Sequence, residues 1–341
     1  MAKKRSKSKK TTTAKKSRKP KSRVKGAGTT TRRAKQASSS TSPKRPPAAK
    51  SVPTIHRLYG ALKAGASDDQ LNDLVRELIS EVLRKHPVAD QYNLLILFDK
   101  TRLMRTDADR IYRSITKFAK KKPILLVLCS SGGEIDAAYF ISKLCREYAE
   151  DKFIVAVPRE AKSAATLICC GADEIHMGSL SELGPIDPQI KNRPALALKQ
   201  SVEHLAELTK TYPTAQEMFA TFLSKSLELS QLGYYERIAE SAVQYAERLI
   251  AKRLTKLSKP ANKIAHNLVY AYKDHGFVID VAEAETVFDK SMIKHNSSEY
   301  RLSDALYERL KLIERYFRLF ANKGFYFVGS QDSDAGIYDL K

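Results

Sequence analysis

The chain has 341 residues, and its 60 lysines and arginines against 38 aspartates and glutamates give a formal net charge of +22. The first fifty residues hold nineteen basic and no acidic side chains, so the rest of the chain has a net charge of only +3. That remainder is long enough for one large domain or two small ones, and it lacks the run of about 18 uncharged apolar residues that a membrane span needs.

We expect a disordered polybasic tail over residues 1–52, because Lys, Arg, Ser, Thr, Ala and Pro offer almost nothing to bury. The charge of residues 1–50 predicts nonspecific contact with nucleic acid, and a solubilising or targeting tail is the alternative. No apolar segment follows these charges, which argues against a secretory signal. The four cysteines lie in apolar segments without metal-ligand spacing, so we expect no metal, no cofactor and no disulfide framework. Together these features predict a cytoplasmic protein that the tail could associate with the nucleoid.

Residues 53–90 predict an N-terminal helical segment. Ser67 and Gln70 have the spacing of a capping box, and apolar residues then recur at helical spacing between Leu71 and Leu83. Pro87 is expected to end this helix.

Residues 91–192 alternate short apolar runs with helical stretches. The runs at 94–98, 124–128 and 153–157, with a shorter one at 174–177, are typical of buried parallel strands. Thr106 and Asp109 are predicted to cap the helix after the first strand, and a helix of small residues is expected over 163–171. This rhythm indicates an α/β fold, a parallel sheet with helices packed on it.

Residues 193–322 are predicted to be mainly helical, and Thr214 and Glu217 have the spacing of a further capping box. Their apolar stripes predict core or oligomer contacts, and we expect a homo-oligomer. The final segment, 323–341, is expected to contain a strand at 325–328 followed by a tail.

Two turns follow the carboxyl ends of predicted strands, where open α/β sheets place ligands. In the first, Ser131-Gly132-Gly133, paired glycines let backbone N–H groups approach a ligand at the start of the next helix, as an oxyanion hole requires. In the second, Lys162-Ser163-Ala164-Ala165-Thr166, small residues leave the Ser163 hydroxyl open to a substrate. Taken singly, the first turn could be an ordinary tight turn and Ser163 an ordinary helix N-cap.

The two turns, followed by Leu183-Gly184-Pro185-Ile186-Asp187-Pro188-Gln189, resemble the Clp-fold serine proteinases, in particular the serine dehydrogenase proteinase family near the signal peptide peptidase A group. The resemblance covers residues 94–190 and extends weakly to the His-Gly-Phe-Val-Ile-Asp element that begins at His275. It implies a Clp/crotonase-like fold of repeated β-β-α units over residues 91–341. It also implies that Ser163 is the nucleophile of a serine peptidase acting through an acyl-enzyme on a protein or peptide substrate. Gly132, Gly133 and Ala164 would then form the oxyanion hole.

The general base has several candidates. The Clp protease has a histidine about two dozen residues after the serine, but this chain has Asp187, Pro188 and Gln189 there, and His176 lies earlier, in a predicted strand. His275 and Lys199 are the leading candidates, and Asp187 is given a supporting role or that of a rigid turn. Two further lysines could serve as the base, although each has a surface role as its simpler interpretation: Lys191 and Lys162, of which Lys162 is expected to point elsewhere.

Two other classes of function compete with the peptidase. A catalytically inactive Clp-fold scaffold could bind nucleic acid or a protein partner through the basic tail. An acyl-thioester enzyme of the crotonase type would share the paired N–H groups, but such enzymes commonly use carboxylates, which Lys162-Ser163-Ala164-Ala165-Thr166 does not offer.

Overall fold

The structure is a computed structural model that describes residues 52–190, 193–226, 229–253 and 257–340. The expectations for the basic tail, apart from its last residue, therefore lie outside the described residues. Within the described residues, no helix is both long and apolar enough to cross a membrane.

The central sheet is predominantly parallel, as predicted, and also contains two antiparallel strands, which were not predicted. Its main path runs β11-β10-β1-β2-β3-β5-β9, with β1, β2, β3, β5 and β9 parallel and β10 and β11 antiparallel. The strands are β1 (Asn93–Asp99), β2 (Ile124–Ser130), β3 (Phe153–Val157), β5 (Glu174–Met177), β9 (Ile293–His295), β10 (Lys323–Gly329) and β11 (Gly336–Asp339). Two short strands, β4 (Glu160–Ala161) and β6 (Glu182–Leu183), pair beside β2, and β7 (Gln189–Ile190) pairs with β8 (Arg193–Pro194).

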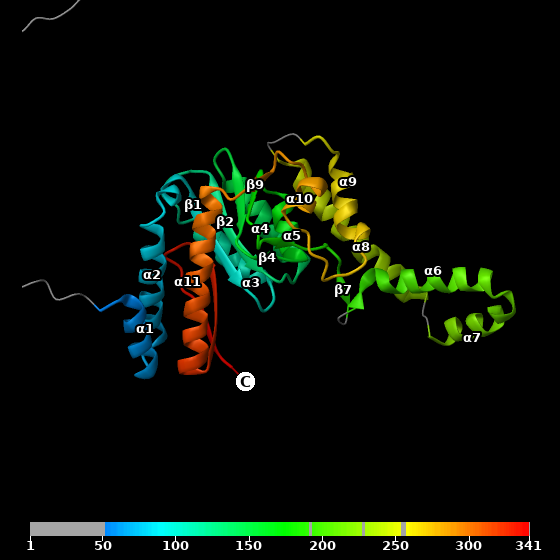
Figure 1. Ribbon diagram of the computed structural model, residues 1–341, viewed down its shortest axis with the longest axis horizontal. Coiled ribbons are helices and arrows are strands. Elements are labelled where there is room, and N and C mark those ends of the chain that lie inside the picture. The colour runs from blue at the N-terminus through cyan, green and yellow to red at the C-terminus, as the bar shows by residue number, and fades with distance from the viewer. Residues whose placement is uncertain (1–51, 191–192, 227–228, 254–256, 341) are drawn as a thin grey trace, which may run out of the picture. The chain divides into compact units, whose positions relative to one another are not determined.

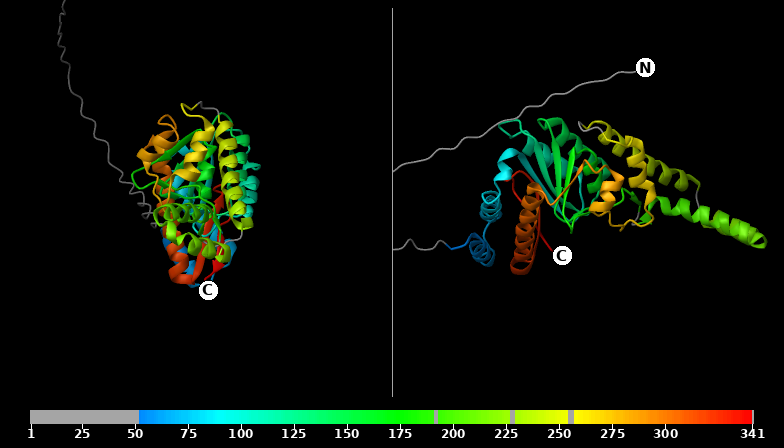
Figure 2. Two further views of the ribbon diagram at one scale, coloured as in Figure 1. Left: turned by 90° about the vertical axis from the view of Figure 1, so that its right-hand side faces the viewer. Right: turned by 45° about the horizontal axis from the view of Figure 1, so that its top comes forward.

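Helices cover both faces of the sheet. The helical elements are α1 (Thr54–Lys63), α2 (Asp68–Leu83), η1 (Pro87–Gln91), α3 (Arg105–Ile115), α4 (Ile135–Tyr148), α5 (Ala164–Cys170), α6 (Ala195–Thr211), η2 (Pro213–Ala215), α7 (Gln216–Ser226), α8 (Leu229–Ala251), α9 (Ala261–His266), the π-helix η3 (Asn267–Ala271), α10 (Val281–Val287) and α11 (Ser298–Ala321). Figure 1 shows α2 and α11 side by side, and Figure 2 shows the sheet between that pair and α8.

The strands β1, β2 and β3 are almost continuously apolar because each buries both of its faces. Leu95 and Leu97 of β1 pack in one core with α3, α4, α5 and α8, whereas Ile96 and Phe98 pack in another with α1, α2 and α11. Successive side chains of a strand point to opposite faces, so a strand covered twice has no polar alternation. The helices of 53–90 thus share a core with β1.

Local signals located some helix starts and missed others. Ser67 and Gln70 form the predicted capping box of α2. The prediction for Thr106 and Asp109 is wrong, since α3 begins at Arg105. The backbone of Leu103 forms hydrogen bonds to the two neighbours of Gly133. Its carbonyl accepts the Glu134 N–H, and its N–H donates to the Gly132 carbonyl. This pairing fixes the chain just before Arg105, where α3 begins.

The new start gives α3 a different cap, in which the Asp107 carboxylate accepts the Met104 N–H at 2.8 Å. Thr214 is not an N-cap either, because it lies inside η2, which precedes α7.

A buried ionic cluster joins β5 to the start of α11. His176 is 3% exposed, with Nδ1 2.6 Å from Ser297 Oγ and 3.4 Å from Glu299 Oε2, and Nε2 3.2 Å from Glu174 Oε2. Burial lowers the pKa of His176, but its hydrogen bonds to Glu174 and Glu299 outweigh burial and leave that pKa raised. The cluster therefore favours a charged imidazole.

Acid is expected to remove the stabilisation that this cluster provides. The hydrogen bond from His176 lowers the pKa of Glu174 from 4.5 to about 2, although burial opposes the shift. Because the folded pKa is depressed, the contribution is present above about pH 4.5 and is lost as the pH falls through about 2. His176→Gln should lower the free energy of unfolding by about 1–2 kcal/mol at pH 5, a partial effect because the carboxylates are part-exposed.

Urea unfolding of both proteins at pH 5 and pH 3 measures this difference. The difference should shrink at pH 3, which lies between the two pKa values of Glu174, because the unfolded state already binds the proton there while the folded wild type does not. A difference that is equal at the two values would contradict the assignment of the cluster as an ion-pair network.

Candidate active site

The segments that carry the predicted site residues meet along a short cross-ladder. Ala161 of β4 pairs with Ser130, the last residue of β2, and with Leu183 of β6. Leu183 pairs in turn with Ile279. Each of these four residues lies within four positions of a predicted site residue: Gly132, Ser163, Asp187 and His275, respectively for Ser130, Ala161, Leu183 and Ile279. The ladder therefore brings these distant parts of the chain together.

Ser163 occupies a strained turn at the start of α5. Its backbone has φ 51° and ψ −118°, and its side chain makes no capping hydrogen bond to the helix. A non-glycine residue in such a conformation costs about 1–3 kcal/mol and persists only where its surroundings impose it. The position is an N-cap, as the simpler interpretation predicted, but the hydroxyl does not perform the capping role.

The glycine pair lies directly against this turn. Gly132 has φ 101°, and a Cβ there would lie 2.7 Å from the Lys162 carbonyl oxygen and 3.0 Å from Ser163 Cβ. The Gly132 N–H already donates to Ser130 Oγ at 3.2 Å, and its carbonyl accepts the Leu103 N–H at 2.8 Å. Gly132 therefore leaves space beside Ser163, and its own N–H has an acceptor within the turn.

Two other backbone N–H groups at this point remain without a protein acceptor among the described residues. They belong to Gly133 and to Ala164, the first residue of α5. Both residues line the same cleft as Ser163. Such a pair of donors matches what stabilisation of an oxyanion needs.

The cleft that contains these groups has a volume of about 640 Å³. The predicted residues Ser163, Gly132, Gly133, Ala164 and His275 all line it. The remaining lining residues combine polar and apolar side chains: Thr101, Arg102, Ser131, Ile135, Ile186, Pro188 and Ile238. Ser131, Ile186 and Pro188 belong to the motifs singled out in the sequence, whereas the other four were not connected with the site. Thr101 and Arg102 could have been found, because they follow β1 at the same edge of the sheet.

His275 lies in a turn after η3 and faces Asp187. Its Nδ1 is 3.7 Å from Asp187 Oδ2, and the Asp187 side chain is 9% exposed while that of His275 is 35% exposed. The segment that carries Asp187 is hydrogen-bonded to η3, since the Ile186 N–H donates to the Leu268 carbonyl at 2.8 Å. The structure thus brings together a serine, a histidine and a buried carboxylate from three separate segments.

The candidate lysines are placed differently. The Lys162 ammonium is 3.0 Å from the Glu182 carboxylate, and Lys162 does not line the cleft, in agreement with the expectation that it points elsewhere. Lys199 lies in α6, but its side chain is outside what the structure describes, and Lys191 is outside the described residues altogether. His176 belongs to the buried cluster of β5 and not to this cleft.

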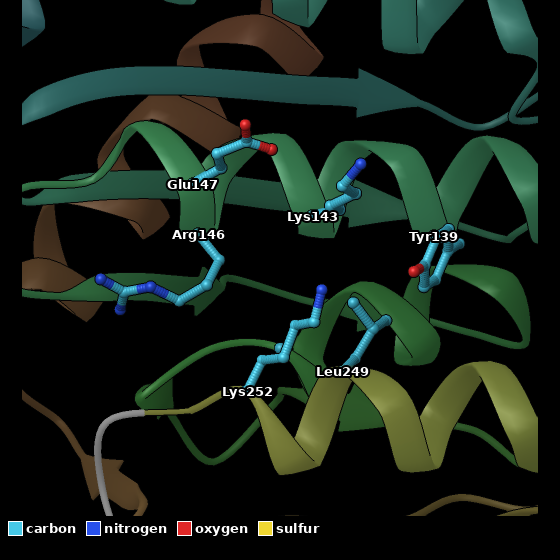
Figure 3. Close-up of a pocket in the computed structure, with 7 residues that line it drawn as sticks. Tyr139, Lys143, Arg146, Glu147, Leu249 and Lys252 are labelled. Carbon is cyan, nitrogen blue, oxygen red and sulfur yellow. The ribbon is translucent and has the colours of Figure 1, made fainter.

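A second pocket, of about 500 Å³, lies between α4 and α8 (Figure 3). Its basic side chains, Lys143, Arg146 and Lys252, come from the last two turns of α4 and from the residue after α8. Cations offset the helix dipole at such ends, and Arg146 is also paired with the buried Asp173. These features account for the charge of the pocket without a ligand.

The described residues contain no group of three or more His, Cys, Asp or Glu side chains that could hold a metal ion.

The parallel-dominated sheet thus carries a strained serine turn directly beside a glycine turn. The model of the ClpP-like SDH-type serine proteinase family matches residues 93–285, more than half of the chain, and the chain belongs to this family. The match confirms the resemblance seen in the sequence.

Two curated relatives are proteins of Methanocaldococcus jannaschii. The chain is 37% identical to the uncharacterized protein MJ0137 over 97 residues, which are 28% of this chain and 34% of that protein. It is 28% identical to the uncharacterized protein MJ1495 over 149 residues, 44% of this chain and 50% of that protein. The chain thus spans half or less of the length of these relatives.

Among solved structures, two mutants of the 1510-N membrane-bound stomatin-specific protease are similar to this chain. One, with a serine replaced by alanine, gives a TM-score of 0.39 at 15% identity, covering 66% of this chain and 86% of that one. The other, with a lysine replaced by alanine and a substrate peptide bound, gives a TM-score of 0.38 at 13% identity. That match covers 72% of this chain and 90% of that one.

Proposed function

We propose that the chain is a serine peptidase with Ser163 as nucleophile, His275 as general base and Asp187 as the group that orients the histidine. The observation that carries this proposal is the convergence of Ser163, His275 and two available N–H groups on one cleft, with Asp187 beside the histidine. Family membership supports the same reaction class.

The reaction follows the usual course of acyl transfer. Ser163 Oγ attacks the peptide carbonyl carbon while its proton passes to Nε2 of His275, the ring nitrogen away from Asp187. The Gly133 and Ala164 N–H groups donate to the oxyanion. His275 then protonates the leaving amine as the C–N bond breaks, and a water molecule that His275 deprotonates hydrolyses the acyl-enzyme.

His275 is preferred to Lys199 because it lines the cleft and has a carboxylate neighbour. The alternative of an inactive scaffold acting through the tail finds no support in the cleft, and the tail lies almost wholly outside the described residues. The proposed peptidase unit is residues 91–341, with 53–90 packed on its sheet.

A fluorophosphonate probe should label the native protein, and peptide mapping by mass spectrometry should locate the adduct on Ser163. The strained backbone holds this hydroxyl uncapped beside the two donors, which stabilise the negative charge that develops as the probe reacts. An adduct on Ser131, which lines the same cleft, or labelling that persists after denaturation, would contradict the assignment.

A further inference from the structure

The ammonium group of Lys162 lies where three segments of the candidate site meet. Its Nζ is 3.0 Å from Glu182 Oε2, 3.3 Å from the Phe277 carbonyl oxygen and 3.5 Å from the Leu183 carbonyl oxygen. An ammonium has three N–H donors and no acceptor, so these three partners match its full capacity. With its side chain only 15% exposed, Lys162 is a cation enclosed by acceptors and is not placed to accept a proton.

The backbone of Lys162 is equally engaged. Its N–H donates to the Ser130 carbonyl at 3.0 Å, and its carbonyl accepts the Ala165 N–H at 2.8 Å. The aliphatic part of the side chain crosses Gly184, where an added Cβ would lie 2.7 Å from Lys162 Cδ. Lys162 therefore holds the turn before Ser163 in two ways: its backbone bonds to Ser130 and Ala165, and its side chain packs on Gly184 and pairs with Glu182.

The segments that Lys162 contacts are those that carry the other two members of the proposed triad. Phe277 follows His275 by two residues, and Leu183 precedes Asp187 by four. We infer that Lys162 is a positioning residue, whose ammonium holds the Ser163 turn at a fixed separation from His275 and Asp187. This inference rests on the proposed function, because it assigns Lys162 a role in that triad.

Removal of the charge should loosen this arrangement while leaving the reacting groups present. Lys162→Met keeps the aliphatic stem over Gly184 but leaves the Glu182 carboxylate and two carbonyl oxygens without their donor. Because a misplacement of about 1 Å can reduce the rate by about 100-fold, kcat should fall by about 10- to 100-fold with KM nearly unchanged. Lys162→Arg, which restores a cation, should recover part of kcat.

The matched control is Lys152→Met. Lys152 is 2.8 Å from Glu174 in a comparable Lys–Glu pair, but it lies before β3, at the other end of the strand from the cleft. Its removal should leave kcat within about twofold, because no segment of the cleft depends on it. Hydrogen–deuterium exchange provides a readout that does not depend on activity.

The test compares wild type and the three variants by steady-state kinetics, pH profile and exchange. Exchange over residues 182–187 and 274–279 should be faster in Lys162→Met than in Lys152→Met, and the acid-side decline of kcat/KM should persist in Lys162→Met. Unchanged exchange would overturn the inference, and loss of the acid-side decline would make Lys162 itself the base. If wild type is not labelled at Ser163 while the exchange difference is present, the proposed function fails and the structural connection stands.

Discussion

Ser163→Ala is expected to lower kcat for peptide hydrolysis by about 10⁵- to 10⁶-fold, with KM nearly unchanged. The hydroxyl is the only group in the proposed reaction that forms a bond to the substrate, so its loss removes the acyl-enzyme route. The residual rate would come from the oxyanion donors and the binding of substrate. Hydrolysis of a fluorogenic peptide or casein, followed over hours for the variant, measures the loss.

Ser131→Ala is the matched control, because Ser131 lines the same cleft. Its Oγ donates to the Lys100 carbonyl at 3.2 Å, so its hydroxyl has a structural partner. Its activity should remain within about fivefold of wild type. If Ser163→Ala kept wild-type activity, the nucleophile would have to be another residue.

Ser163→Gly separates the backbone from the hydroxyl. Glycine adopts a positive φ without a Cβ penalty, so this variant should be as inactive as Ser163→Ala yet more stable than wild type by about 1 kcal/mol. Chemical denaturation measures the gain. A gain in stability together with a loss of activity would identify the strain as a property kept for function.

The parallel core of the sheet could be predicted from the sequence because burial on both faces leaves a strong local pattern. Three apolar runs became β1, β2 and β3, and the small-residue stretch after Ser163 became α5. The edge strand β9 was missed because three residues, Ile293–His295, are too few to form a pattern and include a lysine. The antiparallel direction of β10 was not predicted either, because no residue of a strand encodes its direction.

The Ser163 turn and the glycine turn could be located from the sequence because each is a short contiguous motif. The pairing of His275 with Asp187 could not, because it depends on a turn after η3 folding onto a segment almost ninety residues earlier. Sequence reasoning therefore retained His275 and Lys199 together. The Gly132 N–H donates to Ser130 Oγ, a contact that only the folded turn reveals, and for this reason the oxyanion proposal uses the Gly133 and Ala164 N–H groups.

His275→Ala is expected to lower kcat by about 10⁴-fold or more, because the Ser163 hydroxyl would lose its proton acceptor. Protonation of a histidine base abolishes its function, so wild type should show a decline of kcat/KM on the acid side. That decline should disappear from the residual activity of His275→Ala. Added imidazole should restore part of the activity, since the removed ring borders an open cleft.

Two companion variants decide between the candidate bases. Asp187→Asn should lower kcat by about 10²- to 10⁴-fold, because an amide beside Nδ1 no longer stabilises the imidazolium that forms during attack. Lys199→Ala should leave the pH profile unchanged. If instead Lys199→Ala removed the activity and His275→Ala kept it, the base would be a lysine delivered by α6, and the contact between His275 and Asp187 would serve only to brace the loop. The two outcomes differ by orders of magnitude in the same assay, so the identity of the base follows from a single pair of substitutions.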